Sequence, residues 1–138
     1  MEKVERFYIG PQIEMPRIRS EACAGGVPTV AVAKAGNLVF TNGVVSNHLE
    51  TGEHVAGDIR VQTRQVLENL KLEIEKAGTR FENVVMVHAF LKNMEDWPAY
   101  HDVYIEYFPE HTPPPRYTVL AEMASPELLV EIHMTAAV

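Results

Sequence analysis

The chain has 138 residues, of which 46% are hydrophobic, a composition that supports the core of one ordinary domain and excludes a disordered chain. The formal net charge is −7, from 12 basic and 19 acidic residues without a basic stripe, so binding to a phosphate backbone has little electrostatic support. Because the N-terminus is charged and no stretch approaches the roughly 20 apolar residues of a membrane span, we expect one cytoplasmic domain over residues 1–138, without nucleic-acid or membrane partners.

The first half of the chain predicts short strands followed by a long helix. Residues 4–9, 29–33 and 38–41 are apolar or β-branched, and the four residues between the last two segments predict a hairpin turn. Asp58 suits a helix N-cap and Gly78 suits the position just after a helix C-terminus. Between them, apolar or small residues recur at steps of three and four and predict one buried helix face. These residues are Ile59, Thr63, Val66, Leu67, Leu70, Ile74 and Ala77.

The second half predicts a strand over residues 84–91, a helix over 95–108 and strands over 116–121 and 128–136. Pro98 is compatible with this helix only in its first turn. The order of elements is typical of an α+β fold, with two helices packed on one face of a mixed sheet. Since the other sheet face also needs cover, we expect a further subunit there.

Two charged residues lie within apolar strands near the C-terminus. Arg116 shares a strand face with Thr118, and Glu131 shares one with His133, because side chains alternate along a strand. If the two strands are neighbours, one register brings all four side chains together. Buried charges usually have a partner or a ligand. Alternation leaves two interpretations open, namely a structural ion pair between subunits and an arginine that grips a ligand carboxylate with its planar fork.

The sequence does not predict a metal site or a bound cofactor. The chain has six histidines, but none shows the spacing of a metal-binding motif. Cys23 has no activating neighbour, so we do not expect a catalytic thiol.

A series of segments in the same order resembles the RidA (YjgF) family of enamine/imine deaminases. The C-terminal signature is Pro114-Pro115-Arg116 together with Leu129-Val130-Glu131-Ile132, and residues 1–28 diverge. The other similar segments are residues 34–40, 50–53, 62–70, 83–85, 90–94 and 103–104.

The resemblance implies a chorismate-mutase-like domain that forms homotrimers, with sites in clefts between subunits. It also implies hydrolysis of 2-aminoacrylate-type enamines and their imine tautomers to 2-oxo acids and ammonia, without a cofactor. Arg116 falls on the arginine that binds the substrate carboxylate, and Glu131 on the glutamate that positions water. Gly43 falls on a glycine whose backbone lines the pocket.

Four positions depart from the best-studied members of that family. Thr29 replaces a tyrosine, Asn42 a serine, Thr118 a cysteine and His101 an asparagine, so the charged pair is kept while the substrate-binding wall differs. A larger enamine acid is one consequence, and a non-catalytic, carboxylate-binding regulatory trimer is the alternative function. RNA cleavage is a further alternative, and the acidic net charge counts against it.

Overall fold

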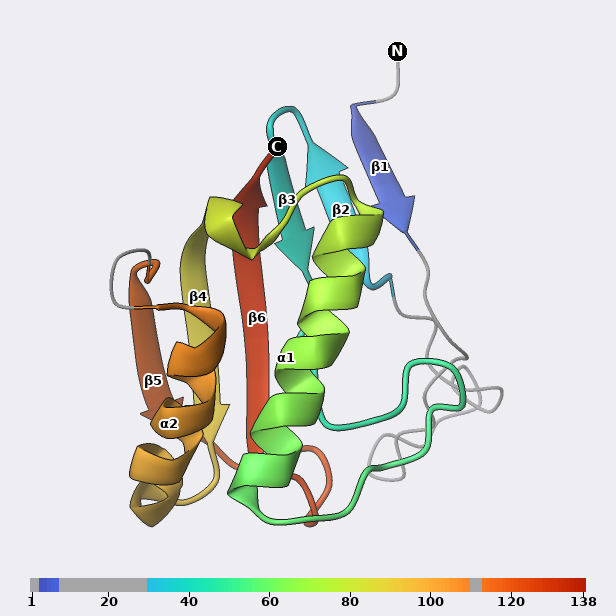
Figure 1. Cartoon of the computed structure of the whole chain (residues 1–138). Helices are drawn as coiled ribbons and strands as arrows, with labels where there is room; N and C mark the ends of the chain where they lie inside the picture. The colour runs from blue at the N-terminus through green and yellow to red at the C-terminus, as the bar shows by residue number, and fades with distance from the viewer. Residues whose placement is uncertain (1–2, 8–29, 110–112) are drawn as a thin grey trace.

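The computed structural model describes residues 3–7, 30–109 and 113–138, which form a six-stranded sheet with both helices on one face (Figure 1). The strand order is β1-β2-β3-β6-β4-β5, antiparallel except for the parallel pair β4 and β5. This arrangement confirms the α+β prediction. The strands are β1 (Val4–Phe7), β2 (Val32–Ala35), β3 (Leu38–Thr41), β4 (Val84–Leu91), β5 (Arg116–Leu120) and β6 (Val130–Ala137), and the helices are α1 (Ile59–Lys76) and α2 (Trp97–Tyr107).

The helix ends follow their local chemistry. The Asp58 carboxylate accepts a hydrogen bond from the Val61 backbone N–H at 3.0 Å, and Gly78 takes a φ of 89° just past the C-terminus of α1, as predicted. Every residue of the predicted α1 stripe is buried. α2 begins after a 3-10 turn at Met94–Asp96, and Pro98 lies in its first turn.

The β2–β3 hairpin is tighter than predicted. Strand β2 continues through Lys34 and Ala35, which the sequence placed in the turn, and Ala35 pairs with Leu38. Gly36 has a φ of 59°, a conformation that glycine adopts at little cost and that permits a two-residue loop. The turn was therefore placed correctly, but its length was wrong.

The main core lies between the helices and the sheet. Leu67 and Leu70 of α1 and Tyr100 and Tyr104 of α2 are at most 2% exposed, and they pack against Ile132 and its neighbours on the inner sheet face. This packing fixes α2 against β4 and β5, and thereby positions the residues at the start of β5. No helix in the described part of the chain is long and apolar enough to cross a membrane.

The opposite sheet face carries no helix in the described ranges and presents apolar and aromatic side chains. His88 of β4 lies between Tyr117 of β5 and His133 of β6, with ring centroids 4.4 Å apart in both cases. Burial and the neighbouring His88 lower the pKa of His133. The most exposed large apolar side chains of this face are Leu38, Phe40, Tyr117 and Val119, at 39–50% exposure. We refer to this side as the open sheet face.

Strands β5 and β6 are not neighbours, so the predicted register that joined Arg116 to Glu131 is wrong. Strand β4 lies between them, and Arg116 pairs with Val87 on the helix-covered face. Glu131 pairs with Phe90 on the open sheet face. The β4–α2–β5 connection explains the parallel β4–β5 pair, since a strand, a helix and a strand in succession favour parallel neighbours, and β6 pairs with the other side of β4. Within one chain, Arg116 and Glu131 therefore face opposite sides of the sheet.

One ionisable group lies in the core. Glu73 of α1 is 2% exposed, and its Oε2 has no hydrogen-bond partner in the structure. Burial raises the pKa of Glu73 from 4.5 to about 8, because desolvation disfavours the charged form. The carboxyl is therefore mainly protonated in the folded protein at neutral pH.

We expect Glu73 to make stability depend on pH. Its folded-state pKa lies above the unfolded value, so its stabilising contribution is complete below about pH 4.5 and is lost as pH rises towards 8. Glu73→Gln should remove this loss, and the variant should gain on the order of 2–4 kcal/mol over wild type between pH 5 and 8. Urea unfolding of both proteins across this range measures the difference. If the free energies of unfolding of wild type and Glu73→Gln depended on pH in the same way, the raised pKa assigned to Glu73 would be contradicted.

Candidate functional site

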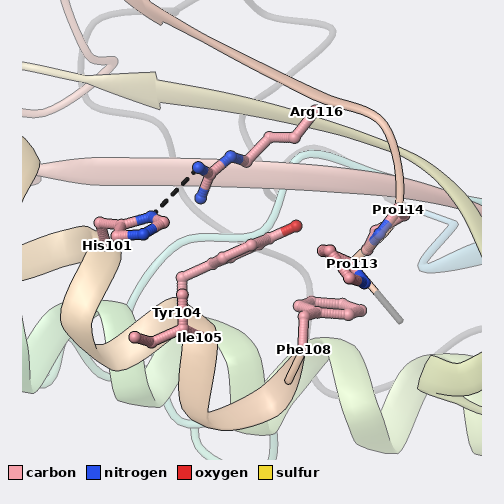
Figure 2. A pocket seen from close by; sticks show the side chains of 7 residues that line it. All are labelled: His101, Tyr104, Ile105, Phe108, Pro113, Pro114 and Arg116. Carbon is pink, nitrogen blue, oxygen red and sulfur yellow. Dashed lines mark hydrogen bonds between the residues drawn. The ribbon is translucent and has the colours of Figure 1, made fainter. Parts of the chain in front are cut away.

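Arg116 extends from the start of β5 towards α2, where its guanidinium meets polar atoms of the helix (Figure 2). Its Nη2 lies 3.1 Å from Nδ1 of His101, and its Nη1 donates to the Tyr100 hydroxyl at 3.4 Å. A guanidinium can only donate, so Nδ1 of His101 is the acceptor in this contact and must be unprotonated. These contacts fix the direction of the side chain.

Three aromatic rings of α2 surround the same cation. The Arg116 Cζ lies 4.1 Å from the ring centroid of Tyr104, 5.5 Å from that of Tyr100 and 5.6 Å from that of Trp97. Ring faces attract a cation, and partial desolvation strengthens this attraction. None of the ion pairs in the described part of the chain involves Arg116. The positive charge is thus held by neutral groups and has no carboxylate there to neutralise it.

Thr118 supports this arrangement from two residues along β5. Its Oγ1 lies 3.1 Å from the Tyr100 hydroxyl, which also receives the hydrogen bond from Arg116. Burial raises the pKa of Tyr100, although Thr118 and Arg116 oppose the shift, so the phenol stays neutral. Thr118 contacts Tyr100 and does not line the adjacent pocket.

Arg116 opens onto a pocket of about 430 Å³. The residues that line it are His101, Tyr104, Ile105, Phe108, Pro113, Pro114 and Arg116. Figure 2 shows the Tyr104 ring running beneath the guanidinium towards the two prolines. The Tyr104 hydroxyl is buried without a hydrogen-bond partner. The pocket therefore combines a fixed cation with an apolar wall, and it suits an anion that carries an apolar group.

Glu131 and Gly43 form a second group, away from Arg116. Gly43 follows β3, and a Cβ added there would lie 3.0 Å from Cδ of Glu131. Glycine thus permits a close approach of the backbone to the carboxyl. Burial raises the pKa of Glu131. The preceding residue, Asn42, has a buried Oδ1 without a partner.

The structure therefore divides the predicted site residues into two groups. Arg116, His101 and Thr118 lie together around α2 and β5, whereas Glu131 and Gly43 lie together where β6 passes the end of β3, and Asn42 adjoins Gly43 in the chain. Thr29 lies outside the described residues. Among those residues, no group of three or more histidine, cysteine or acidic side chains could hold a metal ion.

Sequence reasoning missed the aromatic rings around Arg116. Trp97, Tyr100 and Tyr104 recur at steps of three and four on α2, and this spacing is also that of ordinary core residues. The only available signal was the density of aromatic residues on one short helix, and this does not distinguish a cation site from core packing.

Comparison with known proteins defines the class of this α+β protein. The model of the family described as Endoribonuclease L-PSP matches residues 21–138, and the chain belongs to this family, the YjgF/RidA family. A 3-aminoacrylate deaminase of Acinetobacter baylyi is 38% identical over 111 residues, which cover 80% of this chain and 87% of the relative. A 2-iminobutanoate/2-iminopropanoate deaminase of Dermatophagoides farinae is 32% identical over 96 residues, covering 70% and 75%.

The fold is also that of solved structures. A protein from Thermotoga maritima superposes with a TM-score of 0.79 at 31% sequence identity, covering 97% of this chain and 98% of its own. The similarity thus extends over nearly the whole of both chains.

Proposed function

We propose that the protein is an enamine/imine deaminase that hydrolyses 2-aminoacrylate-type or related imino acids to 2-oxo acids and ammonia. The observation that carries this proposal is the cation of Arg116, fixed by His101 and Tyr100 without an acidic partner in the described chain. A cation that is already oriented and has no acidic partner can bind a substrate carboxylate. The two relatives named as deaminases support the same reaction type. The net charge of −7 gives RNA little electrostatic attraction, so we do not propose ribonuclease activity.

We further propose that a complete site forms between neighbouring subunits of a homotrimer. Arg116 and Glu131 face opposite sides of the sheet in one chain, so they meet only if a second chain supplies one of them. The open sheet face, with Leu38, Phe40 and Val119 exposed, offers an apolar contact for that chain. The trimer then accounts for both the unpaired cation and the exposed apolar surface.

The chemistry requires positioning and proton transfer. Arg116 holds the carboxylate beside the C=N carbon, and Glu131 orients a water molecule towards that carbon. The oxygen of water bonds to carbon, while one proton of the water passes through Glu131 to the nitrogen. As the C–N bond breaks, the proton of the new hydroxyl passes to the same nitrogen, so ammonia leaves and a C=O bond remains. The raised pKa of Glu131 suits it to this task, because it makes the carboxylate a stronger base than that of an ordinary glutamate.

The test is hydrolysis of imino acids generated in situ by an amino-acid oxidase, with semicarbazide trapping the imine that remains. Wild-type protein should shorten the lifetime of the imine and release the 2-oxo acid. Carboxylate binding without any acceleration, across a panel of side chains, would favour the non-catalytic regulatory trimer instead.

Gly43→Ala should reduce turnover while leaving carboxylate binding intact. The new Cβ would lie 3.0 Å from Cδ of Glu131, so the carboxyl must shift by a few tenths of an ångström. Because hydrolysis depends on the position of the oriented water, we expect kcat to fall about tenfold or more. Arg116 is not displaced, so the dissociation constant of a 2-oxo acid should stay within about twofold. If Gly43→Ala weakened the binding of a 2-oxo acid as much as it lowered kcat, the proposal that Gly43 acts by positioning the Glu131 carboxyl would be contradicted.

A further inference from the structure

The pocket beside Arg116 has two chemically different ends. His101 and Arg116 make one end polar, whereas Phe108 of the α2 region, with Pro113 and Pro114 before β5, makes the other end apolar. Figure 2 shows Phe108 and the two prolines on the side of Tyr104 away from His101, and Ile105 below His101 near the base of the Tyr104 side chain. A carboxylate held by Arg116 would therefore have its side chain directed along Tyr104 towards an apolar wall.

The pocket of one chain has about 430 Å³, and in the proposed trimer the neighbouring chain that supplies Glu131 would take up part of it. The apolar wall made by Phe108, Pro113 and Pro114 belongs to the chain that carries Arg116. Apolar walls bind water poorly, so a longer apolar side chain of the ligand would displace water from this wall favourably.

We propose that this site selects 2-imino acids with bulky apolar side chains, branched or aromatic, and that Ile105 and Phe108 set this preference. This inference rests on the proposed deaminase function and specifies its substrate class. Phe108 is 2% exposed and forms a fixed base, whereas Ile105 is 41% exposed and lies at the rim. Each methylene group buried against them should raise affinity roughly threefold to fourfold.

Binding can be measured without turnover. Titration calorimetry on the full-length assembled protein would use propanoate, hexanoate and 3-phenylpropanoate as non-reacting probes. We expect affinity to rise with chain length by roughly threefold per methylene until the pocket is full. Ile105→Ser should weaken hexanoate binding several-fold and leave propanoate unchanged. Leu72→Ser is the matched control, because Leu72 is 56% exposed on the other helix and does not line the pocket.

The rates of hydrolysis of different imines distinguish a failure of the inferred substrate preference from a failure of the proposed deaminase function. Imines derived from leucine and phenylalanine should show a higher kcat/KM than the imine derived from alanine. Ile105→Ser should reduce this preference for the larger imines over the alanine-derived imine. Hydrolysis that favours the alanine-derived imine, with binding independent of chain length, would overturn the inference and leave the deaminase. No hydrolysis of any imine would overturn both, even if binding still rose with chain length. If a short peptide with a free, apolar C-terminal residue bound more tightly than hexanoate and 3-phenylpropanoate, this would also overturn the inferred substrate preference. The pocket would then be assigned to peptide docking.

Discussion

Replacing Arg116 with alanine should lower kcat/KM for imino acids by roughly 10²–10³-fold. A bidentate pair between a guanidinium and a carboxylate makes two charge-assisted hydrogen bonds, each contributing about 1.5–3 kcal/mol. In this protein the fork is already aimed by His101 and Tyr100 and held over the Tyr104 ring, so little ordering remains to be done on binding. Steady-state kinetics with freshly generated imines measures the loss.

Two controls separate the role of Arg116 from a general effect. Arg116→Lys keeps the charge but loses the planar fork, so its activity should lie between those of wild type and the alanine variant. Arg60→Ala removes an arginine whose ion pair with Asp102 is about half exposed, and it should change activity by less than about twofold. Undiminished hydrolysis by a folded Arg116→Ala protein would contradict the proposed anchor.

Glu131→Gln should lower kcat by roughly 10²–10³-fold with little change in ligand binding. Glutamine keeps the shape of the side chain but cannot accept the proton of the attacking water, and such general-base catalysis typically contributes about 10²–10⁴-fold. The dissociation constant of a 2-oxo acid should stay within about threefold, because Arg116 holds the carboxylate. Glu82→Gln, at an exposed carboxylate of the Arg80 ion pair, is the matched control and should be fully active.

The same variant has a stability signature. Burial raises the pKa of Glu131, so the folded state disfavours the charged carboxylate. The contribution of Glu131 to stability is therefore present at pH values below its ordinary pKa and is lost as pH rises through the raised value. Glu131→Gln should be as stable as wild type, or more stable, at neutral pH. Marked destabilisation there would instead indicate that the carboxylate has a structural partner.

The local elements of this fold could be predicted from the sequence, but the order of strands in the sheet was only partly predictable. Asp58 and Gly78 mark the ends of α1 because capping depends on residues close in the chain. Alternation gives the face on which Arg116 or Glu131 lies within its own strand, but it does not give the neighbouring strand. The succession of β4, α2 and β5 already favoured a parallel pair. It did not show that β6 lies on the other side of β4 instead of beside β5, which is what the strand order shows.

The site was predictable to a similar extent. Charged residues in apolar strands drew attention to Arg116 and Glu131, since burial of a charge needs compensation. The groups that compensate the buried charge of Arg116 were not predictable, because His101, Tyr100 and Trp97 contact Arg116 only after α2 packs beside β5. The separation of Arg116 and Glu131 onto two faces is a property of the assembled sheet, and in the proposed site a second chain brings the two residues together.

We propose that Arg116 of one chain and Glu131 of a neighbour share a site, and co-expression of two inactive variants tests this proposal directly. Arg116→Ala and Glu131→Gln chains would carry different affinity tags, and oligomers containing both would be purified through both tags. If neighbours share each site in a closed trimer, every mixed trimer has one intact site, so we expect about one third of wild-type activity per trimer. Mixed trimers as inactive as either parent would contradict the shared site.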